Sequence, residues 1–190
     1  MSNSEFNAQG FFVTQPLLSE SALVQLSQNL DTLTSGSATP RAGDRHLLNH
    51  AWCSQLVQVI GQHTLLRDVL PDSYCAVQCS LFEKSAANNW LVALHQDLSI
   101  PVVDKVEHPA LTAWSNKDGC WFVQAPVEVL EQLVAVRLHV DVCTEIDGAL
   151  KLIAGSHQYG KVDTTQANAL RTLSGERLCA VERGAALVMR

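Results

Sequence analysis

Residues 134–142 alternate strictly in character, and this stretch constrains the fold more than any other. Every even position is Val or Leu, and the positions between hold Ala, Arg, His and Asp. Successive side chains of a β-strand point to opposite sides, so Arg137, His139 and Asp141 share one face. If the apolar face packs on helices, the polar face points into a barrel, where Arg137 can grip a dicarboxylate bidentately. An internal ion pair of Arg137 with Asp141 or a glutamate is the alternative.

Helical patterns fill the N-terminal third of the chain. After Ser19, which can cap a helix, apolar residues recur every three or four positions. These residues are Leu23, Leu26, Leu30 and Leu33. Residues 35–43 have the composition of a loop, and residues 47–70 are expected to form a helix that ends before Pro71.

Short strand-like segments follow Pro71. The predicted strands cover residues 74–82, 90–103, 134–142, 149–153 and 184–190. Between them, residues 104–119 are expected to form a long polar loop and residues 126–133 a helical turn. Helices followed by antiparallel strands predict a mainly β, α+β fold, in which a jelly roll carries helices on one face.

Length and charge narrow the class of protein. With 190 residues, 47% of them hydrophobic, we expect one domain over residues 1–190, with a helical part to about residue 71 and a jelly-roll part from about residue 72. The net charge of -6 contains no block of like charge, which argues against a nucleic-acid or membrane partner and favours a small molecule. Six irregularly spaced cysteines and the lack of a signal-like or 20-residue apolar segment predict a cytoplasmic protein with reduced thiols.

Two His-x-Asp triplets are candidate metal sites. Non-haem iron oxygenases hold Fe(II) with two histidines and one carboxylate, and residues two apart on a strand project to the same face. His95 and Asp97 lie where a predicted strand breaks into a polar turn, whereas His139 and Asp141 lie inside an alternating strand. We therefore prefer the first pair as metal ligands. A histidine that bonds a neighbouring carboxylate is the purely structural alternative.

Two blocks of sequence carry a family resemblance. Residues 89–98, NWLVALHQDL, resemble the metal-binding segment of the phytanoyl-CoA dioxygenase family. Residues 137–157, RLHVDVCTEIDGALKLIAGSH, are similar to that family's signature strand, turn and Pro-Gly-Ser-His loop, with Ala154 in place of the proline and Asp147 where asparagine is frequent. The blocks occur in the family's order, and the resemblance extends over about residues 11–190.

The resemblance implies a double-stranded β-helix that binds Fe(II) and uses 2-oxoglutarate as cosubstrate. In such an oxygenase, 2-oxoglutarate is oxidised to succinate and carbon dioxide while a small molecule is hydroxylated. His95 and Asp97 correspond to iron ligands, and Gln78 resembles a position that hydrogen-bonds 2-oxoglutarate in some members. Arg137, from the strand pattern, is the other candidate for binding that cosubstrate.

The resemblance also implies a third ligand that the chain does not supply. In the family, the distal iron-binding histidine comes just after a strand like residues 184–189, and the arginine that pairs with 2-oxoglutarate follows about one strand later. We therefore expect a jelly roll without its last strand or strands, and a chain that is inactive or impaired as an enzyme. His157 could substitute for the missing ligand, although the family places this histidine in the Gly-Ser-His loop and not on the metal.

Two further hypotheses stay open at the level of sequence. One is a noncatalytic member that keeps the fold as a ligand-binding or oligomeric scaffold, with an open sheet edge as a route to a homodimer. The other is a cupin-like metalloprotein that uses His95, Asp97 and His157 without 2-oxoglutarate. The identity of a substrate is not encoded in any motif of the chain.

Overall fold

A computed structural model describes residues 3–34, 43–84 and 92–190 of the chain. Its α-helices are α1 (Asn3–Gln9), α2 (Glu20–Thr34), α3 (Ala51–Gly61), α4 (Thr64–Arg67), α5 (Val127–Leu130) and α6 (Thr164–Ser174). Its strands are β1 (Phe11–Val13), β2 (Gly43–Asp44), β3 (Leu81–Phe82), β4 (Ser99–Val102), β5 (Thr112–Lys117), β6 (Cys120–Gln124), β7 (Ala135–Leu138), β8 (Leu150–Leu152), β9 (Arg177–Cys179) and β10 (Ala186–Met189). The named strands pair antiparallel, and helices and sheets both contribute substantially, so the fold is mixed where the sequence predicted mainly β.

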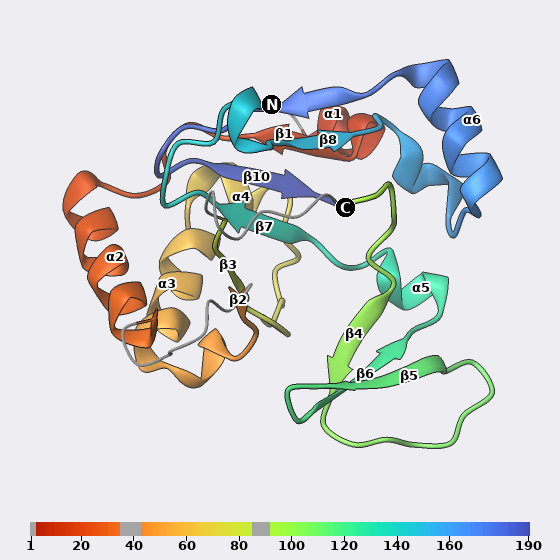
Figure 1. Cartoon of the computed structure of the whole chain (residues 1–190), viewed down its shortest axis with the longest axis horizontal. Helices are drawn as coiled ribbons and strands as arrows, with labels where there is room; N and C mark the ends of the chain where they lie inside the picture. Colours follow the sequence, from red (N-terminus) through yellow and green to blue (C-terminus); the bar gives the residue numbers. More distant parts are fainter. Residues whose placement is uncertain (1–2, 35–42, 85–91) are drawn as a thin grey trace.

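The central sheet has the order β1-β10-β7, with the last strand of the chain in the middle (Figure 1). Leu187 of β10 lies opposite Val13 of β1 on one side and Arg137 of β7 on the other. The predicted strand over residues 184–190 is therefore confirmed, and β10 is not an edge strand. Its four residues are apolar because both of its faces and both of its edges are covered.

Two apolar clusters lie on opposite faces of this sheet. One combines Phe12, Ala186 and Val188 with residues of the helical region such as Phe6 and Leu66, and Val136 packs against it. The other combines Leu187 and Ala185 with Cys179 and Val181, and Phe11, Leu150, Leu152 and Met189 pack against it. The alternation seen in the sequence thus separates a helix-facing side from a side that faces β8 and β9. Arg137 shares its cross-strand position with Leu187 of the second cluster.

The N-terminal helices follow the predicted pattern with one exception. Ser19 caps α2, since its Oγ accepts a hydrogen bond from Ala22 N at 3.3 Å. The expected single helix over residues 47–70 is wrong: it is divided into a 3-10 turn (Leu47–Asn49), α3 and α4. The chain leaves α3 at Gly61, where a Cβ would overlap the hydroxyl of Tyr74. His63 then caps α4 by accepting a hydrogen bond from Leu65 N at 3.3 Å.

A second sheet, β4-β6-β5, forms a lobe at the lower right of Figure 1. It lies partly in residues 104–119, which the sequence predicted to be a loop; that prediction is wrong for β5. The missed signal is Asp118-Gly119, a pair with positive φ values of 53° and 83° that closes the β5–β6 hairpin. Trp114 and Trp121 pack edge to face on this lobe, with a distance of 6.4 Å between ring centroids.

Other predicted strands are present but shorter. Of residues 74–82, only β3 is a strand, and residues 92–98 of the predicted strand 90–103 are irregular before β4 begins. The rest of that segment, and the predicted loop at residues 35–42, lie outside the described residues. The strand at residues 149–153 and the turn of helix at residues 126–133 are present as β8 and α5. The predicted strand at residues 134–142 is present only as β7, which ends at Leu138. His139 and Asp141 therefore lie beyond the strand, and the prediction that they share one strand face with Arg137 is wrong.

The cysteines and helices fit the expectations from composition in part. All six thiols are free, and Cys53 and Cys179 are buried, whereas Cys75 is exposed. Burial next to Cys53 raises the pKa of the Cys79 thiol to about 12, so it stays protonated at neutral pH.

Within the described ranges, none of the helices combines the length and the apolar character that a membrane crossing requires.

Candidate metal centre

His95 and Asp97 meet at the start of the segment that leads into β4. The His95 Nε2 atom lies 3.4 Å from the Asp97 Oδ1 atom, and 53% of the histidine side chain and 98% of the aspartate side chain are exposed. Nδ1 of His95 lies 2.8 Å from the carbonyl oxygen of Ala93. A carbonyl can only accept, so Nδ1 donates, and a neutral ring leaves the Nε2 lone pair facing the carboxylate.

This pair suits a divalent cation in chemistry and in spacing. When the ring is neutral, two electron-pair donors face each other, and one cation bound to both satisfies them. Ligands at adjacent positions of an octahedral ion, with bonds of about 2.1 Å, lie about 3 Å apart, close to the distance observed here. The partner of Nδ1 is of the kind that fixes the tautomer of metal-binding histidines.

The pair provides two ligands of the expected three. Among the described residues, no group of three or more His, Cys, Asp or Glu side chains is arranged to hold a metal ion. The stretches outside the description contain none of these four residue types. The residues of this chain therefore fit two positions of a two-histidine, one-carboxylate set.

His157 does not complete the set. Its Nε2 atom lies 3.0 Å from the carbonyl oxygen of Asn7 and donates to it, and the ring packs so closely on Gly10 that a Cβ there would overlap it. The imidazole thus holds the end of α1 beside the Gly-Ser-His loop. His157 is thus not brought together with His95 and Asp97, and the cupin-like hypothesis, which needs all three residues, gains no support from the described contacts.

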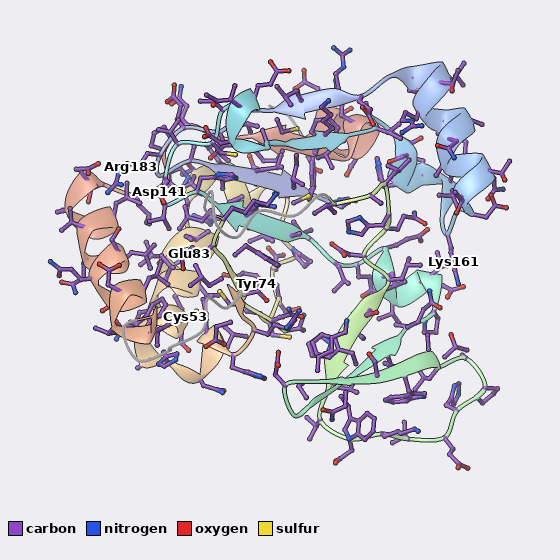
Figure 2. The ribbon with its side chains drawn as sticks, viewed as in Figure 1. Cys53, Tyr74, Glu83, Asp141, Lys161 and Arg183 are labelled. Atoms are coloured by element: carbon purple, nitrogen blue, oxygen red, sulfur yellow. The ribbon has the colours of Figure 1, made fainter. Side chains whose placement is uncertain are left out.

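The second His-x-Asp triplet does not form a pair. The Asp141 carboxylate lies 3.8 Å from the Arg183 guanidinium and is 92% exposed (Figure 2). Arg183 also reaches Glu20 at 3.2 Å, which joins this turn to α2. His139 instead points its Nε2 atom into the protein, where the described residues offer it no hydrogen-bond partner.

Burial of His139 makes the stability of the fold depend on pH. Burial, and secondly the nearby Arg137 charge, hold the pKa of His139 below its usual 6.5. Below pH 6.5 the unfolded chain therefore binds more protons than the folded chain, and stability falls as the pH falls toward the folded pKa. We expect His139→Gln to narrow the difference in the free energy of unfolding between about pH 7.5 and about pH 5.5, measured by urea denaturation. An identical pH profile in the variant would contradict this assignment.

Arg137 lies half-buried on β7, with its guanidinium carbon 5.8 Å from the centroid of the Phe82 ring. The ion pair with Asp141 or a glutamate, which the sequence left open, is not seen in the part of the chain that the structure describes. A cation–π contact of this kind engages the face of the ring and leaves guanidinium N–H donors available to another partner. The side chain is thus arranged in a way that suits an anionic ligand.

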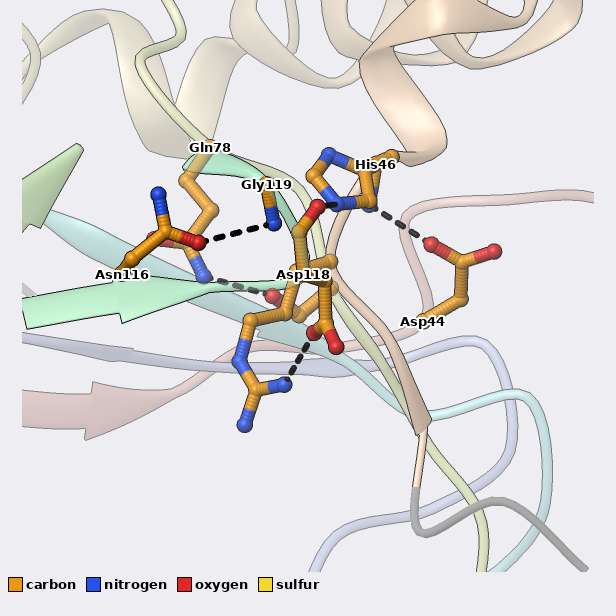
Figure 3. A network of polar contacts seen from close by, with 8 residues as sticks. Asp44, His46, Gln78, Asn116, Asp118 and Gly119 are labelled. Atoms are coloured by element: carbon orange, nitrogen blue, oxygen red, sulfur yellow. Dashed lines mark hydrogen bonds and ion pairs between the residues drawn. The ribbon is translucent and has the colours of Figure 1, made fainter. Parts of the chain in front are cut away.

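Gln78 lies in a different polar network, shown in Figure 3. It is exposed, and its Nε2 atom donates to Ser80 Oγ at 2.7 Å. Around it, the β5–β6 turn docks on the segment after β2, through Arg45 and Asp118 at 2.7 Å and through His46 Nε2 and the Asp118 carbonyl at 3.1 Å (Figure 3). No described contact joins Gln78 to His95, Asp97 or Arg137.

One contributor to the site was missed from the sequence. Gln96, between the two candidate ligands, bonds backbone atoms of Gly160 and Val162. No local pattern could reveal this, because the partners are main-chain atoms 64 and 66 residues away.

Comparisons with known proteins identify the family and the fold. A family model described as phytanoyl-CoA dioxygenase matches residues 6–189. A search of curated proteins found no match. Two solved structures share the fold at low identity. The first is EctD from S. alaskensis with bound Fe, with a TM-score of 0.61 and 14% identity over 98% of this chain and 66% of that one. The second is HygX from Streptomyces hygroscopicus with nickel and 2-oxoglutarate bound, with a TM-score of 0.57 and 13% identity over 100% of this chain and 77% of that one.

The present chain therefore spans slightly less than two thirds of the EctD chain that it matches. The family match covers nearly the whole sequence, including both blocks that carried the resemblance. The chain belongs to the phytanoyl-CoA dioxygenase family.

Proposed function

We propose that the chain functions as an Fe(II)- and 2-oxoglutarate-dependent oxygenase that hydroxylates a small molecule. The observation that carries the proposal is the His95 Nε2 and Asp97 Oδ1 pair, 3.4 Å apart, in a member of this family. Metal and 2-oxoglutarate in the HygX structure, and iron in the EctD structure, support the choice of cofactor and cosubstrate. We also propose that the antiparallel sheets correspond to a jelly roll.

His95 and Asp97 would hold the iron, which supplies the site for activating oxygen and for oxidising 2-oxoglutarate to succinate and carbon dioxide. Ala93 fixes the histidine tautomer through its carbonyl, so that Nε2 can bind the metal. Asp97 supplies the negative charge that neutralises part of the metal's charge. Two ligands bind a metal less tightly than three, so we expect this 190-residue chain to load weakly and to turn over slowly.

Arg137 is our first candidate for the residue that binds the distal carboxylate of 2-oxoglutarate. Its position opposite Leu187 puts it on the sheet face toward β8 and β9, and the Phe82 ring supports its guanidinium. A planar guanidinium binds a carboxylate through two parallel hydrogen bonds. Gln78 stays a second candidate, on the basis of the family resemblance.

Metal-dependent binding of 2-oxoglutarate tests this function. In calorimetric titrations of the whole chain, we expect 2-oxoglutarate to bind when Ni(II) is present and not when the metal is chelated. Arg137→Met should weaken this binding about tenfold or more, which is the effect of losing one hydrogen bond to a charged group. The matched control, Arg171→Met on the exposed face of α6, should not change it.

The outcomes are distinct. Binding of 2-oxoglutarate that is equal with and without metal would exclude the oxygenase and favour the noncatalytic scaffold. Metal-dependent binding that Arg137→Met leaves unchanged would retain the oxygenase and remove Arg137 from the cosubstrate site. Succinate formed with Fe(II) and oxygen, measured by chromatography, then reports the extent of turnover.

A further inference from the structure

The side chain of Gln96 is more buried than those of its two neighbours in the sequence. His95 and Asp97 are exposed, whereas Gln96 is half-buried. Its Nε2 atom donates to the Gly160 carbonyl oxygen at 2.8 Å, and its Oε1 atom accepts from Val162 N at 2.9 Å. The amide therefore uses a donor and an acceptor on the backbone of one short segment, residues 160–162.

That segment is itself anchored on two sides. Lys161, at the right of Figure 2, donates from Nζ to Gln124 Oε1 at 3.2 Å and so ties the segment to the end of β6. Asp163 begins α6 with a capping box, in which Gln166 N donates to Asp163 Oδ1 at 2.8 Å and Asp163 N donates to Gln166 Oε1 at 2.9 Å. Gln96 thus binds a fixed part of the fold.

Across the described part of the chain, no backbone–backbone hydrogen bond holds the segment that carries the proposed ligands. Residues 92–98 belong to no strand, so a sheet ladder does not hold them. The Ala93 carbonyl orients the His95 ring, but it lies on the same irregular segment. Among the described residues, the Gln96 amide links this triplet through its side chain to a distant part of the protein.

We infer that Gln96 is a positioning residue, which holds the His95-Gln96-Asp97 triplet on residues 160–162 so that both ligands face one metal ion. The inference rests on the proposed metal site. The side chains of the triplet are exposed, half-buried and exposed in turn, so the middle one lies toward the protein and the outer two toward solvent. Two hydrogen bonds on the middle one fix the rotation of the triplet about its own axis. Gln96 does not bond the ligand side chains and would act through the backbone between them. Groups that orient metal ligands by direct hydrogen bonds typically contribute 10- to 100-fold to metal affinity, and we take the lower end of this range for Gln96.

The test is a pair of matched substitutions read out by Co(II). Gln96→Met keeps the size of the side chain and removes both hydrogen bonds. Gln158→Met is the control, because Gln158 Nε2 also bonds two backbone carbonyls, those of Asn7 at 3.3 Å and Ala8 at 3.0 Å, away from the metal pair. The dissociation constant of Co(II), its visible absorption spectrum at saturation and the Tm are measured for the wild-type chain and both variants.

We expect Gln96→Met to weaken Co(II) binding about tenfold or more and to change the absorption bands, because the ligands lose their common orientation. Both Gln96→Met and Gln158→Met lose two side-chain hydrogen bonds, so we expect them to lower the Tm by similar amounts. Gln158→Met should leave the Co(II) affinity and the absorption spectrum as in the wild type. Gln96→Asn keeps the amide but is too short to reach both partners. Gln96→Asn should also weaken Co(II) binding. If Gln96→Met does not fold, Gln96→Asn tests whether Gln96 positions the ligands.

Three results would overturn the inference. Wild-type affinity and spectrum in the folded Gln96 variants would show that the triplet does not need this link. Equal weakening by Gln158→Met would show that the effect is a general loss of stability. If His95→Ala leaves the Co(II) affinity of the chain unchanged, the proposed metal site fails as well. In the first two cases that site stands.

Discussion

Replacing Asp97 by alanine is expected to weaken Co(II) or Ni(II) binding by more than about 100-fold, since losing even the partner of a ligand costs 10- to 100-fold. The substitution removes the anionic member of a two-residue donor set and leaves a single neutral imidazole. The Asp97 side chain is 98% exposed and is not part of the core. Its loss should therefore change the Tm very little. The metal affinities of the wild-type chain and of Asp97→Ala can then be compared with both proteins fully folded.

Asp141→Ala is the matched control for this prediction. Asp141 belongs to the other His-x-Asp triplet and is nearly as exposed, at 92% of its side chain, but its nearest charged group is the Arg183 guanidinium. An exposed ion pair of this kind contributes little to stability. Isothermal titration with Co(II) should show wild-type affinity in Asp141→Ala. Equal affinities in the Asp97 and Asp141 variants would assign the metal elsewhere.

Replacing Leu187 by alanine should destabilise the protein by about 2–5 kcal/mol, the range for removing a buried leucine side chain. Leu187 is 1% exposed, in the strand between β1 and β7, and belongs to the cluster on the face toward β8 and β9. Both neighbouring strands restrict the collapse of the cavity, so the cost should lie well above that of a surface change. Urea denaturation should show a lower midpoint with an unchanged slope.

Leu178→Ala provides the comparison for Leu187. Leu178 lies on β9 and is 39% exposed, so less apolar surface returns to water when its side chain is shortened. We expect a loss below about 1 kcal/mol. Similar losses for the two variants would contradict the placement of β10 at the centre of the sheet.

The contact between His95 and Asp97 is local, so the sequence could suggest it, whereas their role as metal ligands stays a prediction. His95 and Asp97 are two residues apart, and that spacing puts their side chains within reach of each other once the chain is extended. The same spacing exists for His139 and Asp141, which do not meet, because burial takes the histidine inward and Arg183 attracts the aspartate. The sequence therefore supplied both candidates, and context favoured one of them.

Prediction of the elements succeeded where a local rule acts and failed where a distant contact decides. The Ser19 cap and the strands β7, β8 and β10 follow from spacing and alternation. The break after α3 depends on Tyr74, whose hydroxyl occupies the space beside Gly61. The strand β5 depends on pairing with β6 across the Asp118-Gly119 turn, which was hidden in a polar segment.

The sequence by itself determined the family, the alternation that gives the central sheet two different faces, and a His-x-Asp pair that is the candidate metal site. These are properties of neighbouring residues, and short-range sterics and hydropathy are enough to express them. Only the tertiary structure decided that β10 lies between β1 and β7, that His157 binds α1, and that Gln96 reaches residues 160–162. Each of these contacts joins chain segments that are tens of residues apart and that come together only when the apolar faces are buried. No local pattern in either segment indicates which distant segment it will contact.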